Sequence, residues 1–374
     1  MLVREDLNVP MKAGGIVDDS RVRAAAPTLR HLAQRGARVI VMSHLGRPKD
    51  REPDLSLRLL ATDLGRRVGR DVRFAADCVG EKATSAVNAL QSGQVLLLEN
   101  VRYHTEDESN DAGFARSLAS LGDIFVNDAF AASHRAHASV VGVAAYLPAY
   151  AGELMVAELQ ALHRALDTPR RPLVAVVGGA KVSTKVGVLR NLLQKVDSLL
   201  IGGAMANTFF KARGWPTGTG LVEDSALDEA TAVTKAAGDK LVLPLDLVTA
   251  RKMQAGEPLR IFDANKVEPE WAAYDVGPRT VSLFRERLRG AGTVIWNGPV
   301  GVAEIRDFTD GTKAVGEAIA SSGAYTLVGG GDTVAAVDAL GLSGRYSWVS
   351  TGGGATLEYL EGKELPGIAI LKDA

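Results

Sequence analysis

The chain has 374 residues, which is room for about two domains of ordinary size. It carries 43 Lys and Arg against 44 Asp and Glu, a formal net charge of −1, whereas a general nucleic-acid binder is strongly basic. Apolar residues make up 46% of the chain, which excludes wholesale disorder. The single cysteine, Cys78, excludes an intrachain disulfide and fits a reducing, cytoplasmic setting. We expect Cys78 to be a small buried residue rather than a reactive thiol.

Neither the start of the chain nor its apolar stretches predict a membrane partner. Charges at Arg4, Glu5 and Asp6 leave no room for the apolar region of a signal peptide. The most apolar long stretch, residues 136–152, is short and is interrupted by polar residues and a proline. Such a stretch makes a poor membrane span.

Short apolar runs alternate with amphipathic segments along the whole chain. In chain order, the runs and the turns that follow them occupy residues 38–48, 95–104, 124–130, 173–181, 199–205, 293–301, 325–333 and 347–356. Candidate helices between them cover residues 25–34, 56–68, 185–196 and 333–340. Runs of β-favouring residues that alternate with helices indicate parallel strands buried on both faces. The predicted fold class is therefore α/β with doubly wound parallel sheets.

A boundary between two lobes is predicted near the middle of the chain. Residues 154–166 have apolar side chains at helical spacing, and the prolines in residues 168–172 stop a helix. One helix and a stiff turn would join the lobes as a hinge, although an ordinary crossover helix fits the pattern equally well. We expect an N-terminal lobe over 1–150, the hinge over 151–170 and a C-terminal lobe over 171–355.

Ligands of open parallel sheets bind outside the carboxyl ends of the strands, so the residues after each apolar run matter most. In the first half of the chain these include Arg4, Arg21, His44, Arg47, Arg102 and Arg135. A surface ion pair explains any single arginine, but a converging set predicts a small, multiply charged anion. Asp6 and Asn8 could accept hydrogen bonds from a substrate hydroxyl, or they could serve only as turn formers.

In the second half, glycines end the apolar runs, and glycine lets backbone amides approach a phosphate. Thr333 begins a helical segment, so residues 331–333 would present a helix N-terminus to an anion. Asp332 beside it is a candidate Mg²⁺ ligand, because carboxylates and phosphates share that hard ion. Each glycine taken singly could instead serve only a tight turn.

Two lysines lie at the start of another predicted helix. Ser183 or Thr184 looks like its N-cap, which places Lys185 in the first turn and Lys181 just before it. The helix dipole disfavours cations there, so the pair suggests a bound anion, with two solvated lysines as the alternative.

The sequence lacks the motifs that mark several other classes of protein. No G-x-G-x-x-G opens a helix, and no G-x-x-x-x-G-K-[ST] is present, which argues against a nicotinamide dehydrogenase and a P-loop NTPase. No G-x-S-x-G or Cys/His nucleophile arrangement appears. His134 and His137 have H-x-x-H spacing but no third ligand in the nearby sequence, so no zinc site is expected there.

A set of ordered motifs resembles the phosphoglycerate kinase family from about residue 2 to the end. They include VREDLNVP (3–10), SHLGRP (43–48), LLLENVRYH (96–104), VNDAFAASHRAH (126–137), GGAKVSTK (178–185), WNGPVGVAE (296–304), GGGDT (329–333) and STGGGATLEYLEGKELPGI (350–368). The resemblance implies an enzyme of glycolysis and gluconeogenesis. It would transfer a phosphoryl group between ATP and 3-phosphoglycerate, giving ADP and 1,3-bisphosphoglycerate, and it would be a cytoplasmic monomer.

The resemblance also implies a division of labour between the lobes. Residues matching the family's phosphoglycerate site in the N-terminal lobe are Asp6, Asn8, Arg21, His44, Leu45, Gly46, Arg47, Arg102 and Arg135. Residues matching the Mg-nucleotide site in the C-terminal lobe are Lys185, Ala273, Pro299, Glu304, Gly330, Gly331, Asp332 and Thr333. Arg21, Lys181 and Lys185 would be catalytic, Glu304 would bind the ribose and Asp332 the metal. Residues 356–374 would return to the N-terminal lobe, and the lobes would close on their substrates.

The chain departs from the family pattern at several places. The usual chain begins earlier, so Met1 falls inside the first strand, and we expect either a misassigned start or a less stable lobe. Glu5 replaces an apolar residue and would bury a charge. Further departures are Leu7, Thr184, Ala204, Ala273, Val300 and Ala303. None removes a charged catalytic candidate, so we expect activity to survive.

Three alternatives stay open at this point. A non-catalytic nucleotide-binding protein would bind ADP without turnover. A dehydrogenase with an unusual dinucleotide loop is disfavoured by the missing glycine motif. A scaffold role is neither supported nor excluded by the sequence.

Overall fold

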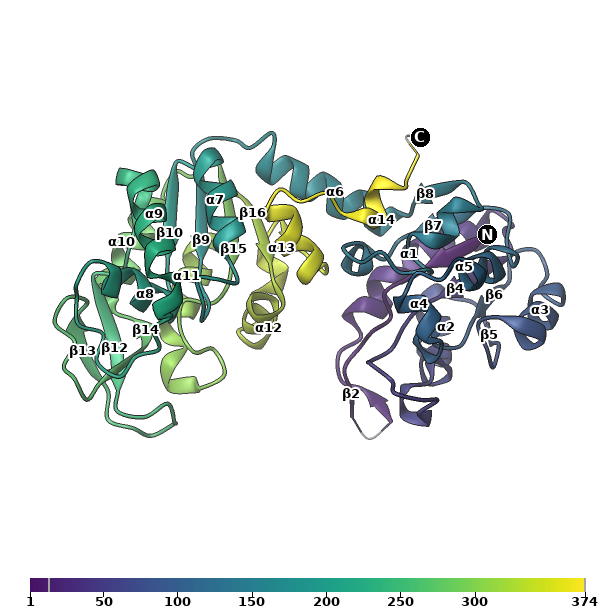
Figure 1. The fold of residues 1–374 in the computed structure, drawn as a ribbon, viewed down its shortest axis with the longest axis horizontal. Coiled ribbons are helices and arrows are strands. Elements are labelled where there is room, and N and C mark those ends of the chain that lie inside the picture. Colours follow the sequence, from purple (N-terminus) through teal and green to yellow (C-terminus); the bar gives the residue numbers. More distant parts are fainter. Residues whose placement is uncertain (13, 373–374) are drawn as a thin grey trace. The chain divides into compact units, whose positions relative to one another are not determined.

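The computed structural model describes residues 1–12 and 14–372, which form two compact units (Figure 1). Unit 1 comprises Met1–Leu159 and the segment that begins at Glu364, and unit 2 comprises Gln160–Lys363. The division between the units falls within helix α6 (Glu153–Leu166). The sequence predicted an N-terminal lobe over 1–150, a hinge over 151–170 and a C-terminal lobe over 171–355.

The C-terminal segment joins unit 1 later in the chain than residue 356. Helix α13 (Gly354–Leu360) packs on α7 (Val186–Lys195) in unit 2, where Asn191 Nδ2 donates to the Leu360 carbonyl at 2.8 Å. Beyond it, helix α14 (Pro366–Ala369) contacts unit 1, since the Gly367 carbonyl accepts from Asn127 Nδ2 at 2.8 Å. The hydrogen bonds of residues 356–363 therefore hold that stretch to unit 2.

Unit 1 is built on a six-stranded parallel sheet in the order β5-β6-β4-β1-β7-β8. Its strands are β1 (Leu2–Arg4), β4 (Val39–Met42), β5 (Val72–Phe74), β6 (Val95–Leu97), β7 (Phe125–Asn127) and β8 (Ala149–Ala151). Alternate residues enter two separate cores: Leu2 and Phe125 lie in one, whereas Val3 and Val126 lie in the other. This alternation follows from the two-residue period of a strand, and it confirms the prediction of a sheet buried on both faces.

Four helices cover the two faces of this sheet. Side chains of α1 (Ser20–Gln34) and α2 (Ala61–Val68) complete one core, and those of α3 (Gly80–Asn88) and α5 (Ala112–Ala119) complete the other. The short helix α4 (Thr105–Glu108) precedes α5. Helix α1 begins five residues earlier than predicted. The helix predicted over 56–68 is divided into a 3₁₀ turn, Leu57–Leu60, and α2.

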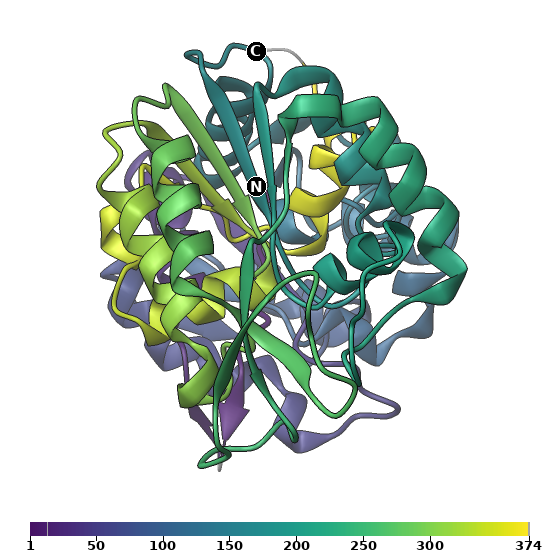
Figure 2. The same cartoon turned by 90° about the vertical axis from the view of Figure 1, so that its left-hand side faces the viewer.

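Unit 2 contains a second six-stranded parallel sheet, in the order β11-β10-β9-β15-β16-β17. Its strands are β9 (Leu173–Val177), β10 (Ser198–Ile201), β11 (Leu241–Val242), β15 (Thr293–Asn297), β16 (Tyr325–Gly329) and β17 (Trp348–Val349). Helices lie on both faces of this sheet (Figure 2). In addition to the second half of α6, and to α7 and α13, the unit contains α8 (Met205–Ala212), α9 (Leu227–Ala237), α10 (Pro278–Leu288), α11 (Asp310–Ala320) and α12 (Gly331–Ala339). The predicted α/β class with two doubly wound parallel sheets is confirmed.

A small antiparallel sheet in unit 2 was not predicted. It has the order β13-β12-β14 and consists of β12 (Asp246–Ala250), β13 (Arg260–Asp263) and β14 (Ala272–Val276). The residues of β13 are exposed or half-buried, so this strand lacks the continuous apolar run that marks a buried one. A two-stranded hairpin, β2 (Met11–Lys12) with β3 (Gly15–Ile16), was missed for the same reason. Within the described part of the chain, no helix is both long enough and apolar enough to cross a membrane.

Candidate active site

In each parallel sheet the connections reverse direction next to the central strand, and ligands of such sheets bind where this reversal opens a crevice at the carboxyl ends. The reversal lies between β1 and β7 in unit 1 and between β9 and β15 in unit 2.

In unit 1, hydrogen bonds join the segments that follow β1 and β4. Arg21, from α1, donates through NH1 to Asp6 Oδ2 at 2.6 Å and to the Asn8 carbonyl at 3.2 Å. Asn8 Oδ1 in turn accepts from the amide of Gly46 at 2.8 Å. Gly46 has a φ of +63°, a conformation that glycine adopts without strain. The structure thus brings four of the predicted residues together.

The segment after β6 joins the same group. Arg102 NH1 donates to the Gly46 carbonyl at 2.8 Å, and its Nε lies 3.2 Å from Glu108 Oε1. Arg47 is exposed next to Gly46. The Leu45 side chain is only 1% exposed and belongs to the core, so a contribution from this residue to ligand binding must come from its backbone.

The pKa of His44 shows how positively charged this group of residues is. Burial lowers the pKa of His44 well below its usual value, and the charges of Arg4, Arg102, Arg21 and Arg135 lower it further. The imidazole is therefore neutral, and Arg4 NH2 lies 3.1 Å from its Nδ1. Four guanidinium groups that act on one imidazole form a strongly cationic site, which suits a multiply charged anion.

Two of these arginines differ in their surroundings. The Arg4 side chain is fully buried and donates through Nε to Ser139 Oγ at 3.1 Å, so it supports the site from within the core. Arg135 is half-buried and donates through Nε to His134 Nε2 at 3.2 Å. His134 thus has a partner other than a metal ion.

In unit 2, Lys185 lies immediately before α7. The prediction that Ser183 or Thr184 caps this helix is wrong: Lys185 itself occupies the N-cap position, and the helix begins at Val186. Ser183 instead donates its amide to Glu223 Oε2 at 2.9 Å, and Thr184 Oγ1 donates to the Lys181 carbonyl at 3.0 Å. The Lys181 side chain is exposed.

The Lys185 ammonium group reaches across the reversal in the sheet to the end of β15. Its Nζ donates to the carbonyl oxygen of Asn297 at 3.0 Å and also to Asn297 Oδ1. Burial lowers the pKa of Lys185 to about 8, and the nearby negative charge of Asp332 opposes this shift. The group is therefore a partly desolvated cation at neutral pH.

Glycines let the loops after β9 and β15 approach closely. A Cβ on Gly178 would lie 2.0 Å from the Pro299 carbonyl oxygen, which no side chain could tolerate there. The same carbonyl accepts from the amide of Gly179 at 3.1 Å. The amide of Gly298 donates to Thr333 Oγ1 at 2.6 Å, which connects this loop to α12. Pro299 and Thr333 are thereby brought beside Lys185 and its partner.

The N-terminus of α12 completes this group. Gly330 is its N-cap, with a φ of +92°, and Asn297 Nδ2 donates to the neighbouring Gly329 carbonyl at 3.0 Å. Gly331 and Asp332 are exposed in the first turn. An exposed carboxylate at this position fits a hard cation such as Mg²⁺, which commonly binds through one or two carboxylates together with substrate phosphates.

Ala273 and Glu304 lie at the loop that follows β15. Glu304 is an exposed residue of that loop, and the amide of Val302 in the same loop donates to the Tyr274 carbonyl at 2.8 Å. Ala273 precedes Tyr274 on β14 and is half-buried.

Asn297 was not among the predicted site residues. Its place directly after the apolar run of β15 was the available signal, because the ends of central parallel strands carry the binding groups.

Two parallel sheets with cationic groups and loop amides at their carboxyl edges define an α/β protein that binds phosphate-bearing anions. A model of the family described as phosphoglycerate kinase matches residues 1–363. The phosphoglycerate kinase of Moorella thermoacetica is 52% identical over 377 residues, which cover 100% of this chain and 96% of the relative. That of Synechococcus sp. (strain JA-3-3Ab) is 50% identical over 392 residues, covering 100% and 95%.

Solved structures agree with the sequence relatives. The structure of phosphoglycerate kinase from Coxiella burnetii matches with a TM-score of 0.90 and 45% identity, covering 99% of this chain and 95% of that one. The enzyme of Pyrococcus horikoshii OT3 matches with a TM-score of 0.86 and 32% identity over the same shares. The chain belongs to the phosphoglycerate kinase family, as its sequence motifs predicted.

Proposed function

We propose that this chain catalyses reversible phosphoryl transfer between ATP and 3-phosphoglycerate, giving ADP and 1,3-bisphosphoglycerate, in glycolysis and gluconeogenesis. The observation that carries the proposal is the cationic group around His44, where burial and then the charges of four arginines lower the pKa of the imidazole. Such a group needs a small, multiply charged anion to relieve its repulsion, and phosphoglycerate carries both a carboxylate and a phosphate. The family match over nearly the whole chain supports the same reaction.

In this proposal unit 1 binds phosphoglycerate. Arg21, His44, Arg47, Arg102 and Arg135 neutralise the anion, together with the backbone of residues 45–46. Asp6 and Asn8 accept hydrogen bonds from the substrate hydroxyl. Because Asp6 already accepts from Arg21 at 2.6 Å, it also fixes the direction of that guanidinium group.

Unit 2 binds the Mg-nucleotide in the same proposal. Lys185 and the amides at Gly330 and Gly331 bind phosphate oxygens, with Thr333 and Pro299 shaping the loop. Glu304 binds the ribose, and Ala273 lies near the base. Asp332 holds Mg²⁺, which when bound supplies positive charge to the nucleotide phosphates.

The transfer requires no protein nucleophile, because positioning and charge stabilisation account for most phosphoryl-transfer catalysis. Arg21 and Lys185 neutralise the charge that develops on the transferring group, and Lys181 assists. Donor and acceptor bind to different units, so the reaction requires that the two ligands be brought into line and that water be excluded. We also propose that the enzyme is a cytoplasmic monomer without nucleic-acid or membrane partners. This part of the proposal stays a prediction from the sequence.

A coupled assay tests this function. ATP, Mg²⁺ and 3-phosphoglycerate are supplied with glyceraldehyde-3-phosphate dehydrogenase, and loss of NADH is followed for the wild type, Arg21→Ala and Lys185→Ala. Turnover that both substitutions abolish supports the kinase. ADP binding in calorimetry without turnover would instead show a non-catalytic nucleotide-binding protein. Tight binding of NADH to the chain alone would favour a dehydrogenase.

A further inference from the structure

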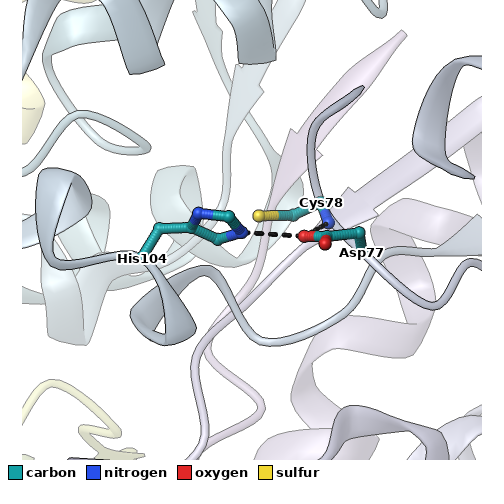
Figure 3. Close-up of side chains that lie close together, drawn as sticks. All are labelled: Asp77, Cys78 and His104. Carbon is teal, nitrogen blue, oxygen red and sulfur yellow. Dashed lines mark hydrogen bonds and ion pairs between the residues drawn. The ribbon is translucent and has the colours of Figure 1, made fainter. Parts of the chain in front are cut away.

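Three side chains with metal-binding atoms meet at an edge of unit 1 that the proposed kinase reaction does not use. Asp77 and Cys78 lie in the turn between β5 and α3, and His104 lies between β6 and α4 (Figure 3). Strands β5 and β6 are neighbours in the sheet, so the two turns emerge side by side. A carboxylate oxygen of Asp77, the Cys78 Sγ and a ring nitrogen of His104 all lie within 4.8 Å of one another.

The polar contacts of this cluster are well defined. Asp77 Oδ1 lies 2.7 Å from His104 Nε2 and accepts from the amide of Cys78 at 2.9 Å. The other oxygen, Oδ2, accepts from Arg51 NH2 at 2.5 Å, and the same NH2 lies 3.3 Å from His104 Nε2. The His104 ring packs against Phe114 with centroids 5.2 Å apart. One carboxylate oxygen therefore faces the imidazole and the other faces the guanidinium group.

We propose that Asp77 Oδ1, Cys78 Sγ and His104 Nε2 form a binding site for a divalent transition metal of the Zn²⁺ type. Thiolate sulfur, imidazole nitrogen and carboxylate oxygen are the three donors that zinc uses in proteins, and three protein ligands leave a fourth position for water or another ligand. Donor atoms around a tetrahedral Zn²⁺ lie about 3.3 to 3.6 Å apart. The 2.7 Å contact between Nε2 and Oδ1 has to open by about 0.6 Å to admit the ion.

Binding exchanges protons for the metal. The ion takes the place of the hydrogen on Nε2, that proton moves through solvent to Nδ1, and the ring binds the metal as a neutral imidazole. The thiol of Cys78 releases its proton to solvent as the sulfur–metal bond forms. The sulfur is buried, but the side chains of His104 and Asp77 are 22% and 17% exposed, which gives the ion a route of entry.

Arg51 is a neighbouring cation that opposes metal binding. Its guanidinium group carries a positive charge at the cluster, so it has to move away from Nε2 when a cation binds. The Arg51 side chain is 44% exposed and already lies 5.8 Å from the centroid of the Tyr103 ring, which offers it an alternative contact. Removal of this arginine should therefore strengthen metal binding.

A titration with Co²⁺ tests the site in the full-length protein. Cys78 is the only cysteine of the chain, so a thiolate-to-cobalt charge-transfer band can come from no other residue. We expect the band to saturate at one equivalent and to disappear when Zn²⁺ is added. His104→Gln and Asp77→Asn should each weaken Co²⁺ binding at least about tenfold, the size typical for the loss of one contact at a metal site. Arg51→Ala should tighten it.

A matched control is available on α6. His163 Nδ1 lies 3.2 Å from Asp167 Oδ2, which repeats the histidine–carboxylate pair without a thiol, so His163→Gln should leave the titration unchanged. Cys78→Ser removes the thiolate that produces the band and can also destabilise the core, so this variant does not test the site. The test therefore depends on the other variants, whose folding is checked by circular dichroism. The proposal is overturned if the folded wild type shows no thiolate band. It is equally overturned if His104→Gln and Asp77→Asn bind Co²⁺ as the wild type does.

Discussion

The ammonium group of Lys185 donates to both oxygens of Asn297, the backbone carbonyl at 3.0 Å and the side-chain Oδ1. The two residues are 112 positions apart in the sequence. Lys185 precedes α7 and Asn297 ends β15, so the pair bridges the reversal of the unit 2 sheet. An amide partner orients the cation without neutralising it, which leaves its charge available to a phosphate.

The proposed role of Lys185 predicts an alkaline limit on activity. Burial lowers the pKa of Lys185 to about 8, so its charge is present below that pH and is lost above it. We expect kcat/KM for the nucleotide to fall as the pH rises through about 8, because this parameter reports the free enzyme. Lys185→Arg keeps its charge throughout and should remove this limb of the profile, even if its maximum is lower. A wild-type profile that stays flat to pH 9 would contradict the role.

Asn297→Asp should move that limit upward. A carboxylate at the same position attracts the Lys185 ammonium and raises its pKa, so the alkaline fall should shift to higher pH. The added negative charge should also weaken ADP binding, which calorimetry measures. Both effects depend on the hydrogen bond to Asn297 Oδ1. A normal alkaline limit with unchanged ADP affinity would show that this contact does not form in solution.

The sequence predicted the parts of this site that follow from local pattern. Apolar runs located β9 and β15, and the residues after them could be identified as ligand-facing because parallel strands end at one edge. The partner of Lys185 could not be deduced, because a contact over 112 residues depends on how the strands are ordered in the sheet.

The roles of the arginines in unit 1 could not be distinguished from the sequence either. Arg4, Arg21 and Arg102 are equivalent in a sequence pattern, since each is a cation near the end of a strand. Burial distinguishes them: Arg4 has no exposed surface, the Arg102 side chain is 7% exposed and the Arg21 side chain is 30% exposed. The antiparallel strand β13 was missed because its exposed residues have no apolar pattern to detect.

Arg21→Ala should lower turnover by at least about a hundredfold, since loss of one preorganised charge contact typically costs about 3 kcal/mol of barrier. The substitution also releases Asp6, whose uncompensated charge then opposes the anion, so the KM for 3-phosphoglycerate should rise. Arg23→Ala is the matched control, because Arg23 is on the same helix but pairs with Asp19 at the surface. A tenfold or smaller loss for Arg21→Ala would exclude the catalytic role, as would an equal loss for Arg23→Ala.

Gly178→Ala should separate the loops that follow β9 and β15. The added Cβ would lie 2.0 Å from the Pro299 carbonyl oxygen, so the backbone has to move and the Gly179–Pro299 hydrogen bond is strained. We expect weaker ADP binding, lower turnover and a lower melting temperature. Gly344→Ala is the matched control, because it makes the same substitution at a position where the Cβ would meet nothing within 4 Å. If Gly178→Ala binds ADP as tightly as Gly344→Ala, the close approach does not position the nucleotide site.

Glu5 imposes a cost on the stability of unit 1 that depends on pH. Its side chain is fully buried, and neither carboxyl oxygen accepts a hydrogen bond from a donor among the described residues. Burial raises the pKa of Glu5 well above its usual value, and the neighbouring charge of Asp128 raises it further. Asp128 in turn accepts from the amide of Met155 at 2.9 Å, so the pair lies at the first turn of α6. A proton shared between the two carboxyl groups would satisfy both.

This arrangement predicts that Glu5→Gln stabilises the protein at neutral pH. A raised pKa in the folded state means that stability is greatest below the ordinary pKa of the unfolded carboxyl and is lost as the pH rises through the folded value. The isosteric amide carries no charge and donates to Asp128, so it should add about 1 to 3 kcal/mol near pH 8 and little near pH 4. Thermal melts of both proteins across this range measure the difference. Glu106→Gln, at an exposed position of α4, should leave the melting curves nearly unchanged. If the gap between wild type and Glu5→Gln did not widen with pH, Glu5 would be charged in the folded state at every pH tested, and the shared proton would be excluded.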